Sequence, residues 1–489
     1  MARHLCISVS LLDRRFHGRR DANQPEWPPS PMRLFQALLA GARTGCRNRH
    51  WSQAKAEAFR WLERQAPPII VAPPARVAAT GHTFYVPNND ADRRFDRQER
   101  LTSKPARPHH LHDGNTVHYL WAIREDQSPD AEQHAEMLCC EARHILALGW
   151  GIDQVVGNGR ILTDEEAAAL TGYRWRVWAG NGDLERRWRV PIDGSLDDLE
   201  RVHRSFVERA AREPYRPQSR IRRYGTVTYS RDTTLPPRSF AVFEVPDGVA
   251  FRHVDAARVA VMLRSLACRP GHRDDFREQF GEDPEVYLAG HVTVGNPTPP
   301  RFSYLPLPTI GHQHADGMIR RLLIAEPYGG DGTHARWAER RLRGQTLHDD
   351  EGNERGILLE PWRPSSRAMI ARYVGEHAVW TTVTPVVLPG YDDFRRVRTR
   401  RDARPTKAER LLFKALQQAG IPLTAVSDAT LRKAPFWPGA QHPRQYHRPN
   451  YLQDYAVWHV RLVFREAIHG PLAVGAGRHC GLGLFAGAE

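Results

Sequence analysis

The chain has 489 residues, of which 41% are apolar, and it carries a formal net charge of +14 at pH 7. This length predicts two to four domains, and the apolar fraction is sufficient to build cores of that size. No window of 18 uncharged apolar residues occurs, so the sequence predicts no membrane span.

The positive charge comes almost entirely from arginine. The lysines are Lys55, Lys104, Lys407, Lys414 and Lys433, among 70 basic residues in all. Guanidinium groups bind phosphates bidentately and stack on bases, which favours a nucleic-acid partner. A GC-rich genome raises arginine over lysine without any function, but it does not account for the positive sum. The charge therefore predicts a polyanionic partner.

The cysteines indicate a reducing compartment. They are Cys6, Cys46, Cys139, Cys140, Cys268 and Cys480, with no Cys-x-x-Cys spacing. This pattern predicts a cytoplasmic protein without structural zinc. The apolar run at residues 4–12 is followed by charged residues 13–15 in place of a small-residue cleavage site, so we expect a first strand and not a signal peptide.

Residues 1–238 predict a first α+β module. Taken in order, the patterns predict a strand at 4–12, helices at 31–43 and 54–65, strands at 69–71, 82–86 and 117–123, and a helix at 131–148. Ser30 and Pro31 have the residue types of an N-cap and a first helical position. The arginine-dense stretch 200–238 closes on two prolines and predicts a linker.

Residues 239–375 and 376–489 predict two further modules. The first has strands at 239–245, 301–307, 318–325 and 356–359 and helices at 255–268 and 333–345. The second has strands at 380–388 and 457–464 around a helix at 406–420, and its basic segment 394–410 favours a phosphate track over a solvated helix entry. The order βαββαβ predicts an α+β chain of several ferredoxin-like (RRM-like) modules, the last two in tandem.

A glycine-rich tail at residues 470–485 is the most informative motif. It contains Gly475, Gly477, Arg478, His479, Gly481 and Gly483. Glycines let backbone N–H groups approach a phosphate ribbon, and the central arginine and histidine add charge and hydrogen bonds. A tight hairpin before a last strand is the structural alternative. The tail is not a nucleotide-binding loop of the Gly-x-x-x-x-Gly-Lys type, because the lysine is absent.

This tail resembles the glycine-rich loop of CRISPR repeat-cleaving endoribonucleases, which are built from tandem ferredoxin-like domains. Further matches lie at Glu26–Leu38, Tyr85–Asn89, Ser303–Pro308, Ala315–Gly317 and Thr384–Val387. Together they are similar to the fused guide-binding and repeat-cleaving subunit of type I-G (formerly I-U) CRISPR systems. The resemblance implies an N-terminal half that binds the 5′ handle of the guide RNA and a nuclease half. The implied partners are the precursor repeat, other Cascade subunits and, only through the complex, target DNA.

Such a nuclease uses no metal or other cofactor: the 2′-hydroxyl of the RNA attacks the adjacent phosphate and leaves a 2′,3′-cyclic phosphate. Histidine suits the general base and the general acid. The candidates are His312 and His314, in a turn where Asp316 is placed to orient an imidazole, and His253, just before a predicted helix. Each has a structural alternative, as a polar hairpin residue or a helix cap.

In the N-terminal module, Trp27 and Arg33 are the candidates for base stacking and phosphate contact, although Trp27 also fits packing between prolines. A non-catalytic RNA-binding scaffold of the same complex is the alternative function. A metal-dependent DNA nuclease is disfavoured because no carboxylates cluster at ligand spacing.

Overall fold

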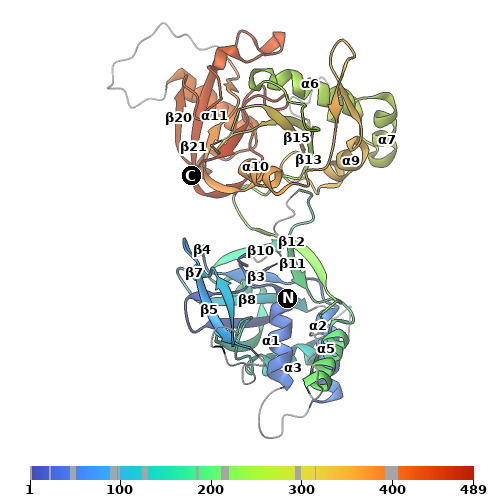
Figure 1. Cartoon of the computed structure of the whole chain (residues 1–489), viewed down its shortest axis with the longest axis vertical. Helices are drawn as coiled ribbons and strands as arrows, with labels where there is room; N and C mark the ends of the chain where they lie inside the picture. Colours follow the sequence, from blue (N-terminus) through green and yellow to red (C-terminus); the bar gives the residue numbers. More distant parts are fainter. Residues whose placement is uncertain are drawn as a thin grey trace. The chain divides into compact units, whose positions relative to one another are not determined.

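The computed structural model describes residues 3–20, 24–43, 51–88, 96, 100–123, 130–182, 187–210, 220–291, 299–313, 315–390 and 406–488. The chain forms two compact units (Figure 1). Unit 1 comprises residues 1–178 and 184–232, and unit 2 comprises residues 179–183 and 233–489. Both units mix helices with sheets, as the sequence predicted. Within the described ranges, no helix is long and apolar enough to cross a membrane.

A seven-stranded sheet forms the centre of unit 1, in the order β11-β12-β10-β3-β8-β1-β9. Its strands are β1 (Arg3–Leu11), β3 (Ile69–Ala72), β8 (Thr116–Ile123), β9 (Val155–Thr163), β10 (Tyr173–Val177), β11 (Arg187–Val190) and β12 (Gly225–Arg231). The helices are α1 (Pro31–Arg43), α2 (Gln53–Glu63), α3 (Ala131–Ala142), α4 (Asp164–Ala168) and α5 (Ser195–Ala210). Strand β1 pairs antiparallel with both β8 and β9, so it lies inside the sheet.

Side-chain alternation explains how this sheet meets its helices. Leu5, Ile7 and Val9 of β1 point to one face and are fully buried in the core of unit 1. Leu34 and Leu38 of α1 lie four residues apart and join the same core. Each such side chain contributes about 1.5–3 kcal/mol when fully buried, which fixes α1 and the loop before it against the sheet.

Two smaller sheets complete unit 1. The order β2-β7-β4 is formed by β2 (Arg15–Phe16), β7 (His109–Leu111) and β4 (Ala75–Val77). Strands β5 (His82–Pro87) and β6 (Leu101–Ala106) pair as a separate hairpin.

Unit 2 contains two main sheets. The first has the order β13-β15-β14, built from β13 (Phe240–Glu244), β14 (Ser303–Pro308) and β15 (Ile319–Ala325). Its helices are α6 (Ala256–Ala267), α7 (Pro270–Phe280), α8 (Pro284–Tyr287) and α9 (Thr333–Leu342), preceded by a 3-10 turn at His253–Asp255. The outer edge of β13 also pairs with the chain at Leu359, through Glu244. A hairpin of β16 (Thr346–His348) and β17 (Glu354–Ile357) and helix α10 (Pro364–Val374) follow.

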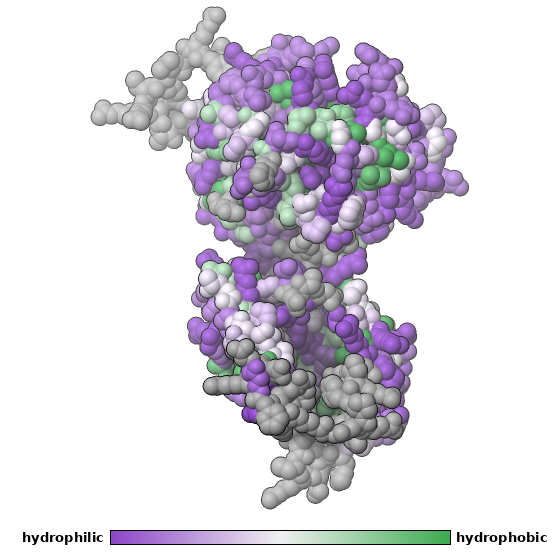
Figure 2. All heavy atoms as spheres, viewed as in Figure 1, coloured by the Kyte–Doolittle hydropathy of each residue, from purple (hydrophilic) through white to green (hydrophobic). Residues whose placement is uncertain are grey.

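The second sheet of unit 2 has the order β19-β21-β18-β22, and β20 also pairs with β21. Its strands are β18 (Glu376–Thr382), β19 (Val386–Val387), β20 (Val426–Arg432), β21 (Val457–His469) and β22 (Phe485–Gly487). Helix α11 (Lys407–Gln418) begins at a capping box between Thr406 and Glu409, and 3-10 turns lie at Leu423–Ala425, Pro443–Gln445 and Asn450–Leu452. In the view of Figure 2, hydrophilic residues cover much of the surface of this unit, in keeping with the charged composition.

Several sequence expectations differ from the structure in their bounds. The helix expected at 131–148 ends at Ala142, and the strand expected at 380–388 divides into β18 and β19. The stretch 200–238, read as a linker, contains most of α5 and the sheet strand β12. The change of unit after residue 232 comes slightly before the expected boundary at 238. The expected basic segment 394–410 lies mostly outside the described residues.

Candidate nucleic-acid interface

An arginine-lined cavity of about 270 Å³ opens in unit 1. We call it the arginine cavity. Its basic residues are Arg19, Arg20, Arg33, Arg187 and Arg189, and its other lining residues include Glu26, Trp188 and Tyr224. The arginines come from the loop after β2, from α1 and from β11, so three separate parts of the chain supply the charge. Five guanidinium groups around one carboxylate make a site for anions.

The one carboxylate of this cavity is already neutralised. Arg33 donates to Glu26 from Nε over 3.2 Å and from Nη2 over 2.9 Å, and the backbone N–H of Ser30 donates to the same carboxylate over 2.5 Å. Burial opposes the charge of Arg33, but Glu26 outweighs it, so the pKa of Arg33 is raised. The pair holds the start of α1 and neutralises the one carboxylate that lines the cavity.

Arg19 carries a donor that the described part of the chain does not satisfy. Its Nη2 is buried and has no hydrogen-bond partner there, while the guanidinium lies 4.7 Å from the centre of the Trp150 ring. Arg189 lies similarly over Tyr224 at 4.5 Å. A buried donor without a partner is rare in folded proteins, and a phosphate oxygen is an acceptor of the kind that would satisfy it.

Of the two residues predicted to contact RNA in this unit, the structure places only Arg33 in the cavity. Trp27 is half-buried, donates from its indole N–H to the carbonyl of Pro73 over 3.2 Å, and meets Phe16 edge to face at 5.9 Å. These are the contacts of a packing residue, and stacking of Trp27 on a base remains a prediction.

The glycine-rich tail runs between the two main sheets of unit 2. Its His479 carbonyl accepts from the N–H of Tyr304 in β14 over 3.2 Å, and Gly483 N–H donates to Pro385, beside β19, over 2.8 Å. Gly481 and Gly483 have φ of 79° and 67°. A Cβ on Gly481 would lie 2.7 Å from the Ala256 carbonyl of α6, and one on Gly483 would overlap the Val474 carbonyl. Close approach to the protein's own backbone thus explains these two glycines.

Three arginines gather around this tail, and we call them the glycine-loop arginine cluster: Arg238, Arg301 and Arg478. Each donates to backbone carbonyls, of Glu326, Gly290 and Gly475 respectively. Burial and then the charges of Arg301 and Arg238 lower the pKa of Arg478 to about 10. Burial lowers the pKa of Arg238, while the nearby charge of Glu326 favours its charged form.

His479 is a half-buried member of this network. Its Nδ1 lies 3.0 Å from the Ser303 hydroxyl, which also accepts from Arg238 over 2.7 Å. Burial and the neighbouring arginines hold the pKa of His479 well below its ordinary value. Tyr451, 69% exposed, lies beside Cys480 of the tail and near Arg301. Sequence reasoning missed Arg301 and Tyr451 because they are distant from the tail in the chain.

The three predicted catalytic histidines differ in their surroundings. His253 is buried before α6, with Nε2 3.1 Å from the Val383 carbonyl and its ring against Tyr446. Burial lowers its pKa to about 4 despite hydrogen bonds to backbone. His312 is exposed in the turn between β14 and β15, and His314 lies outside the described residues. The carboxylate of Asp316, expected to orient an imidazole, is held by Arg320 at 2.6 and 2.9 Å.

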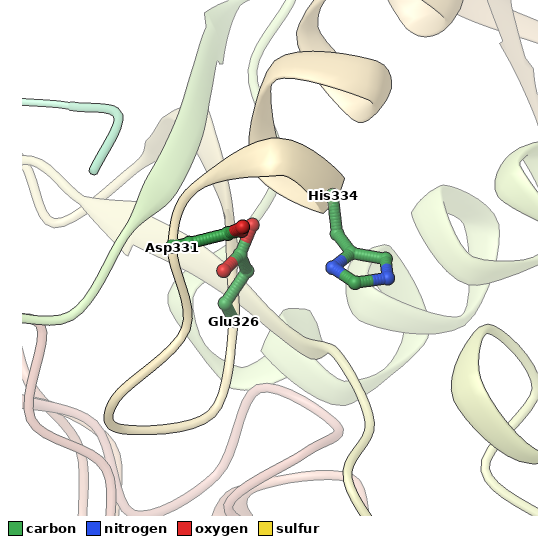
Figure 3. A group of neighbouring side chains, drawn as sticks. All are labelled: Glu326, Asp331 and His334. Atoms are coloured by element: carbon green, nitrogen blue, oxygen red, sulfur yellow. The ribbon is translucent and has the colours of Figure 1, made fainter. Parts of the chain in front are cut away.

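One group of three metal-ligand side chains occurs in the described ranges: Glu326, Asp331 and His334 (Figure 3). The carboxylate of Glu326 accepts from the N–H groups of Gly332 and Ala335 at the start of α9, and Asp331 accepts from Thr333. The Nε2 of His334 faces Glu282 at 3.1 Å. Capping of α9 therefore accounts for this group.

Comparison with known proteins places the whole chain in one family. The family described as "CRISPR-associated protein, GSU0054 family" matches residues 4–487. No curated protein matches the chain. Because the family match runs through both units, with the arginine cavity and the glycine-rich tail inside it, the chain belongs to the GSU0054 family of CRISPR-associated proteins.

Proposed function

We propose that this chain is the guide-RNA-binding subunit of a type I CRISPR surveillance complex and that it cuts precursor repeat RNA without a metal. The arginine cavity of unit 1 is the observation that carries the proposal. Five arginines line it, its one carboxylate, Glu26, is paired with Arg33, and Arg19 holds a buried donor without a partner in the described chain. Phosphate contacts of this kind supply most of the affinity of a protein for RNA.

The strand orders support a chain of ferredoxin-like modules. In unit 1 the order β9-β1-β8-β3 is the 4-1-3-2 arrangement of a βαββαβ module, with α1 and α2 in the first connection and α3 in the second. In unit 2 the same order is traced by Leu359-β13-β15-β14 and by β22-β18-β21-β20. In the last module the glycine-rich tail takes the place of the second helix. We propose that these are the predicted modules, with the last two in tandem.

We propose that cleavage takes place at the exposed turn between β14 and β15. In this step the 2′-oxygen forms a bond to phosphorus, the 5′-oxygen leaves, and the products are a 2′,3′-cyclic phosphate and a 5′-hydroxyl. One histidine takes the 2′ proton and another group protonates the leaving oxygen. His312 is exposed and accessible to RNA, and the Arg372 guanidinium lies against Gly311 of the same turn, where it would supply positive charge for the phosphorane.

A second candidate, the non-catalytic scaffold, is favoured by the state of His253. Its ring is buried, hydrogen-bonded to the Val383 carbonyl and neutral at pH 7, with a pKa of about 4. Of the predicted catalytic histidines in the described ranges, His312 alone is exposed. Cleavage needs both a general base and a general acid, so a second catalytic group must act beside His312.

The test incubates purified protein with labelled repeat RNA from its own CRISPR locus in EDTA and identifies the product ends. His312→Ala, His314→Ala and His253→Ala are run beside His203→Ala, an exposed histidine of α5 that serves as the control. One cut with a 2′,3′-cyclic phosphate, lost in His312→Ala or His314→Ala while RNA binding persists, supports the nuclease. Tight binding of RNA that stays intact supports the non-catalytic scaffold. Absence of RNA binding contradicts both the nuclease and the scaffold.

A further inference from the structure

A second basic surface lies on the small sheet β2-β7-β4 of unit 1. In this sheet His110 of β7 is directly opposite Arg15 of β2 on one side and Arg76 of β4 on the other. Residues directly opposite one another in antiparallel strands point to the same face. The three basic side chains therefore form one row across the sheet, spanning about 10 Å at the usual strand spacing.

The two faces of this sheet differ sharply. Phe16 and His109, the next residues along β2 and β7, are buried, and burial lowers the pKa of His109 to about 4. Arg15, Arg76 and His110 are exposed on the other face. Burial of Phe16 and His109 on the inner face therefore keeps the row of Arg15, Arg76 and His110 on the solvent-exposed face.

The members of this row differ in their partners. Arg15 pairs with Asp13, two residues earlier in the chain, at 2.7 Å. Neither Arg76 nor His110 forms an ion pair or a side-chain hydrogen bond with any residue in the ranges described. A bound phosphate would accept from the donors that Arg76 and His110 offer.

The row lines a shallow hollow of about 480 Å³. Its lining residues are Arg15, Arg76, Val77, Ala78, Ala79, Thr80, His82, Pro108, His110 and His112, with no carboxylate among them. The floor is formed by small side chains, which leaves room for a ligand. A metal is not the expected occupant, because His82, His110 and His112 do not bring three ring nitrogens within 4.8 Å of one another.

We propose that this histidine–arginine surface (Arg15, Arg76, His82, His110 and His112) binds the phosphodiester backbone of a nucleic-acid strand. It shares no residue with the arginine cavity, so the protein offers nucleic acid two separate cationic contacts on unit 1. The chemistry is common to the guide RNA and to DNA. Membership of a CRISPR-associated family and the net charge of +14 favour nucleic acid over an acidic protein.

The test measures binding of the full chain to three labelled probes of one sequence: single-stranded RNA, single-stranded DNA and duplex DNA. Arg76→Ala and Arg76→Glu are compared with Arg64→Ala, which removes an exposed arginine of unit 1 outside both cavities. Because Arg76 is exposed, each variant is expected to melt like the unmodified protein. Loss of one phosphate contact lowers affinity about threefold and reduces the salt dependence by about 0.7 on a log–log plot for a single strand.

We expect Arg76→Glu to weaken binding more than Arg76→Ala, and Arg64→Ala to change it little. An effect on RNA alone assigns the surface to the guide, and an effect on a DNA probe assigns it to target DNA. Equal affinity of both Arg76 variants and the unmodified protein for all three probes overturns the proposal. If Arg187→Ala loses affinity for nucleic acid and the Arg76 variants do not, the proposed role of the arginine cavity stands and only the second contact is contradicted.

Discussion

The two arginine groups of this protein are built in different ways. In the arginine cavity of unit 1, Arg187 and Arg189 lie on β11 with exposed side chains, and one internal ion pair balances Arg33. In unit 2, Arg238 is only 5% exposed and its guanidinium donates to carbonyls and to Ser303. The first group is open to a ligand, whereas the second has donors already committed to the fold. We expect the first to determine RNA affinity and the second to determine stability.

The largest expected effect is a loss of stability when an arginine of the unit 2 group is removed. Arg238→Ala leaves the Glu326 carbonyl and the Ser303 hydroxyl without their donor in a buried site. Each unsatisfied buried group costs about 1–3 kcal/mol, so a loss of about 3 kcal/mol in the free energy of unfolding is expected in a urea titration. Arg187→Ala, on the exposed edge of the arginine cavity, is expected to change it by about 0.5 kcal/mol or less. Equal stability of the two variants contradicts the distinction.

The next largest effect is expected in the pH dependence of the unfolding free energy, to which His253 of unit 2 contributes. Its pKa of about 4 lies below the ordinary value of 6.5, so the unfolded chain takes up the proton first. The contribution is fully present above pH 6.5 and is lost as the pH falls to about 4, to a limit on the order of 3 kcal/mol. His253→Gln is expected to flatten the pH dependence of the unfolding free energy in this window. An unchanged slope shows that the ring is protonated in the folded protein.

A smaller loss of stability is expected from the glycine-rich tail. Gly483→Ala places a Cβ against the Val474 carbonyl at a left-handed φ of 67°, which costs about 2 kcal/mol. Gly271→Ala is the matched control, because that glycine lies in α7 with open space around it, and alanine there favours the helix. Thermal melts of the two variants provide the measurement. Identical melting temperatures show that the tail relaxes around the new side chain.

Local patterns predicted much of the fold but little of the assembled site. The expected helix at 31–43 coincides with α1, because its apolar spacing and its start at Pro31 are local signals. The expected helix at 131–148 runs past the end of α3, where the chain turns before β9. Strand β12 was not predicted, because its segment is rich in arginine and was interpreted as a linker despite the alternation of its residues.

The sites depend on contacts that no local pattern carries. Arg33 was identified from its place in a motif, but Arg19, Arg187 and Arg189 join it only through the folding of unit 1. His253 stands before a helix as expected, yet its burial comes from Val383 and Tyr446, far along the chain. The row of Arg15, His110 and Arg76 arises from strand pairing between residues far apart in sequence.

The most direct test of the central claim is RNA binding by the double variant Arg187→Ala, Arg189→Ala, measured over a range of salt concentrations beside Arg64→Ala. If the arginine cavity holds phosphates, the double variant binds single-stranded RNA about tenfold more weakly, and its log–log salt slope falls by about 1.4. Arg64→Ala then retains nearly the full affinity and slope. If the double variant and Arg64→Ala bind RNA alike, the arginine cavity does not bind RNA and the account of unit 1 is wrong.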